Sequence, residues 1–201
     1  MADPLILAFD TSAAHCAAAL LSGDIVLAAR SEEMGRGQAE RLMPLLEELL
    51  FETGKSWTDL DALGVGTGPG NFTGIRISVA AARGLALALD IPAVGVNGFD
   101  ARACGEATSP VLIAIEAPRA MVYLQRRDGN AAEPELRPAA DIGALDAPVL
   151  WLSDLPGAEM AARIAHVARD RRGEKQPRPA PLYLRPADAA PMRDAPPVIL
   201  P

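Results

Sequence analysis

The chain has 201 residues, 50% of them hydrophobic, so it is long enough to bury a sizeable core. With 4 Phe, 2 Trp and 2 Tyr and a formal net charge of −7, its composition argues against direct binding to nucleic acid. Two Cys and two His exclude a disulfide framework and a Cys/His zinc site, and they favour a reducing compartment. No run of 18 apolar residues and no signal-peptide pattern occurs, so we expect a cytoplasmic protein without membrane contact.

Residues 1–100 carry the pattern of an α/β domain. The almost wholly apolar run at 5–10 is typical of a central strand buried on both faces, and a Gly-Asp turn joins two further apolar runs into a hairpin. The predicted order is strand 5–10, strand 17–21, strand 25–29, helix 38–53, strand 62–66, helix 74–89 and strand 91–96. Antiparallel strands followed by helix-linked parallel strands predict a ribonuclease-H-like α/β layout.

The second half repeats this order in a reduced form. The predicted elements of residues 101–173 are strands 111–115, 120–125, 133–137 and 148–152 and a helix over 158–172. The first three of these strands are expected to form a meander, and the whole is interpreted as a smaller α/β domain. Of the 18 prolines, 8 follow Gly173, so residues 174–201 are predicted to form a Pro-rich extended tail.

A glycine-rich segment over 64–74 lies between a predicted strand and a predicted helix. Such a segment can bind an anion at the helix N-terminus, but it lacks both the Gly-x-Gly-x-x-Gly and the phosphate-loop patterns, so close packing is the favoured interpretation. An actin-like fold places a phosphate or its metal at the end of the first strand, where Asp10, Thr11 and Ser12 stand. The equally weighted alternative is that these three residues only form a turn. The candidate nucleotide-proximal residues are Asp10, Thr11, Ser12, Gly68 and Gly70.

No catalytic or metal-binding set is predicted. His15 and His166 are far apart in sequence, and the adjacent His15 and Cys16 are expected on opposite faces of a strand, so both histidines are interpreted as structural or surface residues. No Gly-x-Ser-x-Gly elbow occurs. The Arg-rich clusters at 126–127 and 169–178 are interpreted as solvated helix ends, with contact to tRNA or to an acidic partner as the alternative.

Several segments together resemble one family. The segments are Ile6–Ser12, Gln38–Pro44, Gly66–Arg76 with its Gly-x-Gly-Pro-Gly-x-Phe-Thr-Gly-x-Arg pattern, Ile91–Val96 and the near-terminal Tyr183–Pro186. They resemble the TsaB family, also called YeaZ, most densely between residues 5 and 96. The resemblance implies tandem ribonuclease-H-like domains of the actin/Hsp70 type, the second one reduced.

The resemblance also implies a function. It is that of a non-catalytic scaffold subunit in the synthesis of threonylcarbamoyladenosine beside the tRNA anticodon. The expected partners are TsaD, which carries a metal and performs the transfer, and the ATPase TsaE, with tRNA reached only through the complex. No cofactor is expected on the isolated chain, ATP or ADP and metal are expected on the partners, and a homodimer of the unpartnered chain stays open. The alternatives are a nucleotide-binding sugar-kinase-like enzyme and, after it, a glycoprotease-like metallopeptidase.

Two helices are candidates for partner contact. A step of about 100° per residue places Arg76, Ala80, Arg83 and Leu87 on one face of helix 74–89, opposite a predicted inner face that includes Ile77, Ser78, Ala81, Leu85 and Leu89. The resemblance implies that this helix and helix 38–53 meet TsaD; a plain solvated face is the alternative. The candidate partner-binding residues are Gln38, Arg41, Leu45, Arg76, Val79, Ala80, Arg83 and Leu87.

Overall fold

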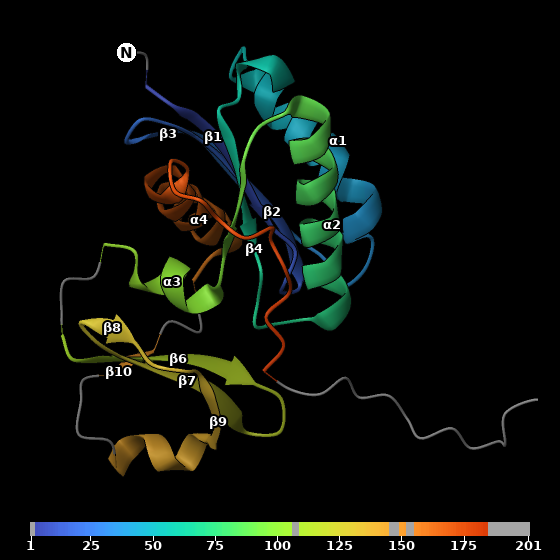
Figure 1. Cartoon of the computed structure of the whole chain (residues 1–201). Coiled ribbons are helices and arrows are strands. Elements are labelled where there is room, and N and C mark those ends of the chain that lie inside the picture. The colour runs from blue at the N-terminus through green and yellow to red at the C-terminus, as the bar shows by residue number, and fades with distance from the viewer. Residues whose placement is uncertain (1–2, 106–108, 145–148, 152–154, 185–201) are drawn as a thin grey trace, which may run out of the picture.

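A computed structural model describes residues 3–105, 109–144, 149–151 and 155–184, and its first half is built on a five-stranded sheet (Figure 1). The sheet order is β3-β2-β1-β4-β5. Its strands are β1 (Leu5–Asp10), β2 (His15–Ser22), β3 (Ile25–Glu33), β4 (Ala62–Gly66) and β5 (Ala93–Val96). β1 and β3 each pair antiparallel with β2, whereas β4 is parallel to β1 and β5. This arrangement confirms the predicted ribonuclease-H-like layout.

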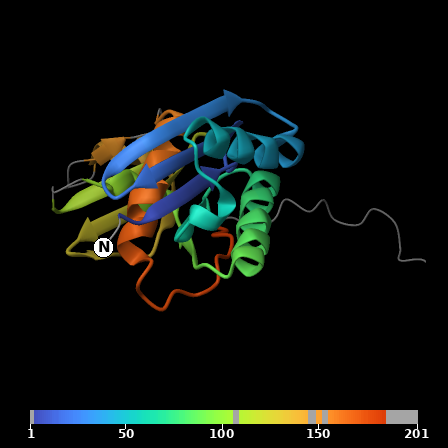
Figure 2. The ribbon, with the colours of Figure 1, turned by 90° about the horizontal axis from the view of Figure 1, so that it is seen from above.

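Helices cover both faces of this sheet (Figure 2). α1 (Gln38–Glu52) and α2 (Phe72–Leu89) lie on one face, and α4 (Gly157–Arg171) lies on the other. The alternation of β1 explains this sandwich, because Leu7 and Phe9 pack toward α1 and α2 while Ile6 and Ala8 pack toward α4. The apolar run at the N-terminus is therefore a central strand buried on both sides, as its composition predicts.

A second sheet contains β6 (Val111–Ala117), β7 (Met121–Asp128), β8 (Asn130–Ala131), β9 (Glu135–Pro138) and β10 (Val149–Trp151). β6, β7 and β9 form the predicted antiparallel meander, and β10 runs parallel to β6. The short helix α3 (Gly98–Ala103) and the 3-10 turns Trp57–Asp59 and Ala139–Ala144 complete the described elements and were not predicted. The second unit is thus a reduced version of the first.

α4 departs from the predicted organisation. It follows the second sheet in sequence, yet Ile164, Ala165 and Ala168 pack on the first sheet. The approach is close because a Cβ on Gly64 of β4 would lie 2.9 Å from the Cβ of Ala168. The boundaries at residues 100 and 173 stay a prediction, but the packing makes α4 part of the N-terminal sandwich.

The chain after α4 turns back across the molecule. Residues 174–184 are extended, as predicted, and the red end of the ribbon reaches the lower end of α2 in Figure 1. The Leu182 backbone N–H donates to the Thr67 carbonyl at 2.8 Å, so this segment is fastened to the glycine-rich loop. The rest of the predicted tail, residues 185–201, lies outside the described residues.

α2 is long and apolar enough to cross a membrane by length and composition alone. In the structure it packs on the sheet through Ile75, Val79 and Ala82 and carries Arg76 and Arg83 on its outer side. We therefore interpret α2 as a covering helix of the sandwich. Only five of its 18 residues are buried, which leaves an unusually apolar helix with a large exposed face.

Candidate functional site

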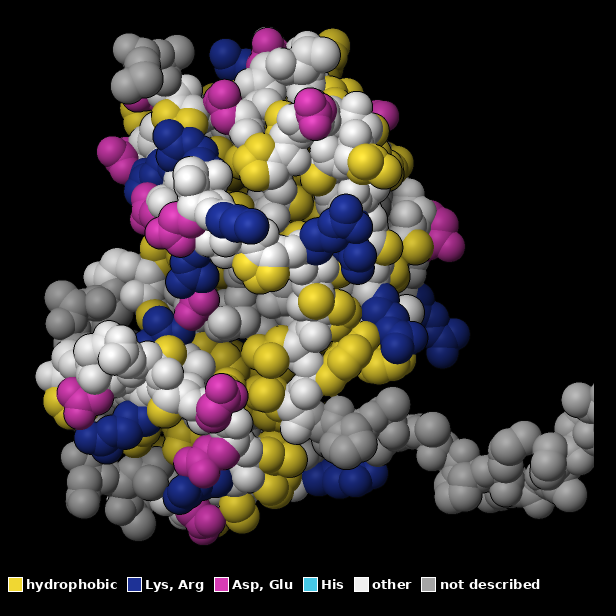
Figure 3. Space-filling model, viewed as in Figure 1, with side chains coloured by type: hydrophobic (Ala, Val, Ile, Leu, Met, Phe, Trp, Pro, Cys, Tyr) yellow, Lys and Arg dark blue, Asp and Glu magenta, His cyan; other side chains and the backbone are white. Residues whose placement is uncertain are grey.

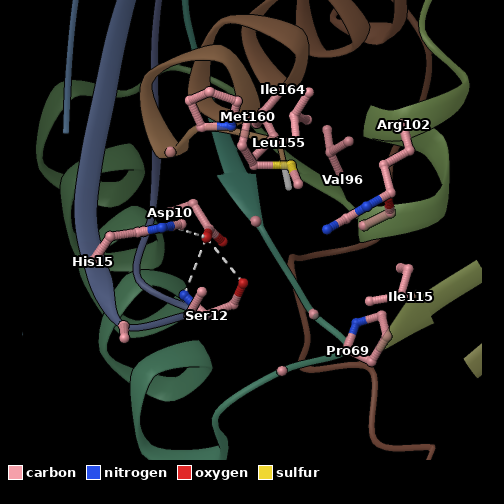
Figure 4. Close-up of a pocket in the computed structure, with 18 of the residues that line it drawn as sticks. Asp10, Ser12, His15, Pro69, Val96, Arg102, Ile115, Leu155, Met160 and Ile164 are labelled. Carbon is pink, nitrogen blue, oxygen red and sulfur yellow. Dashed lines mark hydrogen bonds and ion pairs between the residues drawn. The ribbon is translucent and has the colours of Figure 1, made fainter. Parts of the chain in front are cut away.

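A cavity of about 540 Å³ opens between the two sheets, at the carboxyl ends of β1, β4 and β5 (Figure 4). The turn after β1, the glycine-rich loop and the first turn of α4 form its walls, and β6 of the second sheet closes one side. The cavity is lined by Asp10, Ser12, Gly68 and Gly70, four of the five candidate nucleotide-proximal residues, whose role toward a nucleotide stays a prediction. This is the position in which an open α/β sheet binds its ligand.

Asp10 is the central polar group of the cavity and is only 2% exposed. Its Oδ2 atom accepts from the Ser12 backbone N–H at 3.1 Å and from the Ser12 hydroxyl at 2.9 Å. The same oxygen lies 2.8 Å from Nε2 of His15 (Figure 4). One oxygen of the carboxylate is therefore held by its own chain.

The interpretation of His15 as a purely structural or surface residue missed this contact. Asp10 pairs with Ala17 across the β1–β2 ladder, and His15 is two residues from Ala17, so it shares the same face of the sheet. The pairing register of β1 and β2 brings His15 beside Asp10. The sequence alone does not fix this register, because it depends on which residues form the turn between the two strands. The prediction that His15 and Cys16 face opposite ways is confirmed, because Cys16 is buried on the α1 side.

Thr11 is a correction to the predicted site. Its side chain is fully buried, does not line the cavity and donates its hydroxyl to the Gly74 carbonyl at 2.6 Å. The first strand alternates, so a residue between Asp10 and Ser12 turns toward α2 rather than toward the cavity. Thr11 therefore joins the first strand to α2 and does not face a ligand in the cavity.

The glycines of the loop support close packing. A Cβ on Gly66 would lie 1.9 Å from a carboxylate oxygen of Asp10, and a Cβ on Gly74 would lie 1.9 Å from the Thr11 carbonyl oxygen. A Cβ on Gly70 would lie 2.3 Å from the Ser12 carbonyl oxygen. These three positions admit only glycine because the turn after β1 is pressed against the loop.

The charges around the cavity are mixed. Arg102 of α3 extends toward it and donates from Nη1 to the Gly98 carbonyl at 3.1 Å. Burial lowers the pKa of Arg102 to about 10, and the charge of Asp10 acts in the opposite direction. Glu33 and Glu116 also line the cavity. Three carboxylates and one guanidinium line the cavity, so acidic groups predominate in it.

Two kinds of reactive group are missing among the described residues of the cavity, a metal-binding cluster and a reactive thiol. Within the described ranges, no group of three or more His, Cys, Asp or Glu side chains is placed to hold a metal ion. Cys16 is turned away from the cavity, and burial raises the pKa of its thiol to about 11, so it is a poor nucleophile. The residues present can hold a small polar molecule.

The outer face of α2 is placed as predicted. Arg76, Ala80, Arg83 and Leu87 are all exposed, and Leu87 is 85% exposed. The inner face is shifted from the prediction, because Ile75, Ser78, Val79 and Ala82 are its buried residues. Of the residues predicted to face inward, only Ser78 is fully buried; Ile77, Ala81, Leu85 and Leu89 lie at the borders.

Three predicted partner-binding residues are wrong, because they are buried in the chain itself. Leu45 is 0% exposed and Val79 is 3% exposed, both in the core between α1, α2 and the sheet. Gln38 is 8% exposed and donates its side-chain amide to the Met34 carbonyl at 3.0 Å. Each lies on the side of its helix that faces the sheet, so none of them can contact a partner directly.

Arg41 is partly exposed, but its charge is already paired. Its guanidinium contacts Glu32 at the edge of the sheet and Glu48 on the next turns of α1, in both cases at hydrogen-bonding distance. These two carboxylates raise the pKa of Arg41. A role of Arg41 in partner contact stays a prediction.

Several arginines of the Arg-rich clusters are not simply solvated, as predicted, but bind to other elements of the chain. Asp100 of α3 accepts from Arg127 of β7 and from Arg171 of α4, the latter at 2.7 Å, so one carboxylate ties three elements together. Arg169 donates to the Gly23 carbonyl at 2.9 Å and pairs with Asp24. These arginines hold the second sheet and the β2–β3 turn against α4.

Fold and site together define a protein of the ribonuclease-H-like, actin-type class with an open cavity of about 540 Å³ at the carboxyl ends of its central strands. A family model described as TsaD, tRNA N6-adenosine threonylcarbamoyltransferase, matches residues 31–167, which is more than half of the chain. The chain therefore belongs to this family, and the relatives below assign it to the TsaB (YeaZ) members.

Three relatives support this assignment. The chain is 38% identical to the Escherichia coli tRNA threonylcarbamoyladenosine biosynthesis protein TsaB over 131 residues, which cover 62% of this chain and 56% of that protein. It is 34% identical to an uncharacterized protein of Mycobacterium tuberculosis over 93% of this chain and 94% of the relative. The crystal structure of YeaZ from Pseudomonas aeruginosa aligns with a TM-score of 0.70 and 29% identity, covering 90% of this chain and 100% of the other.

Proposed function

We propose that this chain is a non-catalytic, activating subunit in the synthesis of threonylcarbamoyladenosine in tRNA. It acts by binding a TsaD-type catalytic subunit through the exposed face of α2. The proposal draws on the Escherichia coli relative, whose name places it in that synthesis. A cytoplasmic location, a TsaE-type ATPase as third component and contact with tRNA only through the complex belong to the same proposal.

The single observation that carries the proposal is the outer face of α2. Arg76 and Arg83 form no ion pair with any described residue, whereas eight of the 15 described arginines pair with a carboxylate. On the face shown in Figure 3, basic and hydrophobic side chains lie over the lower part of α2. Unpaired guanidinium groups beside the small Ala80 and the exposed Leu87 suit a helix of an acidic partner.

The cavity supports the non-catalytic part of the proposal. An enzyme of this fold would use the Asp10 carboxylate for a metal or a substrate, but here three groups of the chain already contact one of its oxygens. We therefore assign no cofactor to the isolated chain, and ATP or ADP and metal to the partner subunits.

A sugar-kinase-like enzyme is the second candidate. Asp10 at the end of β1, in a cavity of about 540 Å³, is the observation that favours it. The two candidates make opposite statements about Asp10, since the carboxylate is essential only in the enzyme.

Reconstitution separates the candidates. The chain alone, supplied with ATP, tRNA and the threonylcarbamoyl donor, is expected to show no turnover, and addition of TsaD-type and TsaE-type subunits restores tRNA modification. An Asp10→Asn variant retains most of that activity in the reconstituted system. Turnover by the chain alone that disappears in Asp10→Asn contradicts the proposal and supports the kinase.

A further inference from the structure

The near-terminal Tyr183 lies against the face of α2 that the proposed function uses. Residues 174–184, here called the C-terminal strap, run from the end of α4 over β5 to the first turn of α2. Pro179 is buried against Gly95, where a Cβ would lie 3.4 Å from the Pro179 Cα. The Leu182 N–H bonds to the Thr67 carbonyl. The strap is therefore anchored before it reaches α2.

The extended backbone decides where Tyr183 points. Side chains alternate along an extended chain, and Leu182 and Leu184 both pack on the cluster around Phe99 and Ile115 of the second unit. Tyr183, between them, is turned the other way and is 44% exposed. Its ring lies 5.0 Å from the Phe72 ring, centroid to centroid.

Arg76 lies over the Phe72 ring and reaches the Tyr183 hydroxyl. Its guanidinium carbon lies 3.7 Å from the Phe72 ring centroid and 5.8 Å from the Tyr183 ring centroid. Its Nε donates to the Tyr183 hydroxyl at 2.8 Å. Its two Nη groups form no hydrogen bond with any described residue, although the side chain is fixed in place. A fixed guanidinium with two available donors matches a carboxylate in a bidentate geometry.

We propose that the C-terminal strap is part of the partner-docking surface, and that Tyr183 is a positioning residue which holds Arg76 for a carboxylate of the TsaD-type subunit. This inference rests on the proposed function. The Arg76 side chain is already ordered in the free chain. It therefore loses less conformational entropy when the partner binds. Charge complementarity identifies the occupant as an acidic side chain, since no carboxylate of the described chain pairs with Arg76.

A double-mutant cycle on the full-length chain tests the inference. Affinity for the TsaD-type subunit is measured by calorimetry for Arg76→Ala, Tyr183→Ala and the double variant. Each single change is expected to weaken binding about tenfold, and the double variant is expected to bind no more weakly than Arg76→Ala. Tyr183→Phe, which keeps the ring and loses the hydroxyl, gives a smaller loss. Arg172→Ala, a change of an exposed arginine that precedes the strap, is the matched control and leaves the affinity unchanged.

Two further measurements keep the outcomes distinct. Hydrogen exchange of the Leu182 amide reports whether the strap stays docked in each variant. Native affinity of Tyr183→Ala, or losses that add fully in the double variant, overturns the positioning role, because a merely structural strap is not coupled to Arg76. A separate variant, Ala80→Trp, tests the proposed function itself. If Ala80→Trp binds the TsaD-type subunit with native affinity, the proposed function fails, whatever the result for the Tyr183 variants.

Discussion

The polar side chains in the cleft between the sheets and those on the outer face of α2 differ in whether they have partners within the chain. In the cleft, Asp10 is surrounded by donors of its own chain, and no buried side-chain polar atom of the described residues lacks a partner. On α2, Arg76 and Arg83 are exposed without a carboxylate. The comparison teaches that the chain itself holds one oxygen of the Asp10 carboxylate in the cleft, whereas the two arginines of α2 have no ion pair among the described residues.

The same contrast separates the two helices on one face of the sheet. The one arginine of α1, Arg41, pairs with Glu32 and Glu48, and Glu52 of α1 pairs with Arg30 of β3, whereas Glu40 and Glu47 form no ion pair with a described residue. Exposed ion pairs of this kind contribute little to stability, but they occupy the only basic group of α1. α2 has no such pairs, so we assign the main part of the docking face to α2.

The largest expected effect comes from a substitution that separates the turn after β1 from α2. Gly74→Ala would bring a Cβ to 1.9 Å from the Thr11 carbonyl oxygen, so the turn and α2 must separate. We expect a loss of about 3 kcal/mol or more in the free energy of unfolding, measured by urea denaturation of the isolated chain. Gly84→Ala is the control on the same helix. Nothing lies within 4 Å of its Cβ position, and a gain of about 0.5–1 kcal/mol is expected.

If Gly74→Ala instead unfolds at the urea concentration of the parent chain, the loop does not pack on the turn after β1. The glycines would then have to be explained by a ligand.

A smaller effect on stability is expected at Asp100, whose carboxylate pairs with two arginines. Burial of Asp100 acts to raise the pKa of its carboxyl, but hydrogen bonds from Arg127 and Arg171 and their charges outweigh burial and lower it. The folded pKa lies below the unfolded one, so the stabilisation is complete above the ordinary aspartate pKa of 3.8 and is lost as the pH falls through the folded value.

Asp100→Asn is therefore expected to cost about 2 kcal/mol at pH 7, and the difference from the parent chain should shrink below pH 4. Urea denaturation between pH 7 and pH 3 measures it. A difference that stays constant over this range would show that the charge of Asp100 does not contribute.

Much of the fold could be predicted from local patterns. The β1 run, the β2–β3 hairpin and the exposure of Arg76, Ala80, Arg83 and Leu87 follow from strand composition, turn residues and helical spacing. The inner face of α2 could not be placed accurately, because an apolar helix gives little angular information. For the same reason Val79 was assigned to the wrong side.

The remaining features depend on contacts between distant segments. The pairing of Asp10 with His15 needs the hairpin register, and the return of the strap to Arg76 joins residues 107 positions apart. The packing of α4 on the first sheet depends on the space that Gly64 leaves beside Ala168. None of these is encoded in a local period or a turn signal, so the sequence alone could not show them.

The affinity of the TsaD-type subunit for variants of α2 tests the central claim most directly. Ala80→Trp and Arg83→Glu change only exposed positions, and Arg83 forms no ion pair with a described residue, so the melting temperature of the isolated chain should shift little. The account predicts that each variant loses at least about a hundredfold in affinity, together with tRNA modification in the reconstituted system. Native affinity in both variants would contradict the account, because the exposed face of α2 would then not be the docking surface.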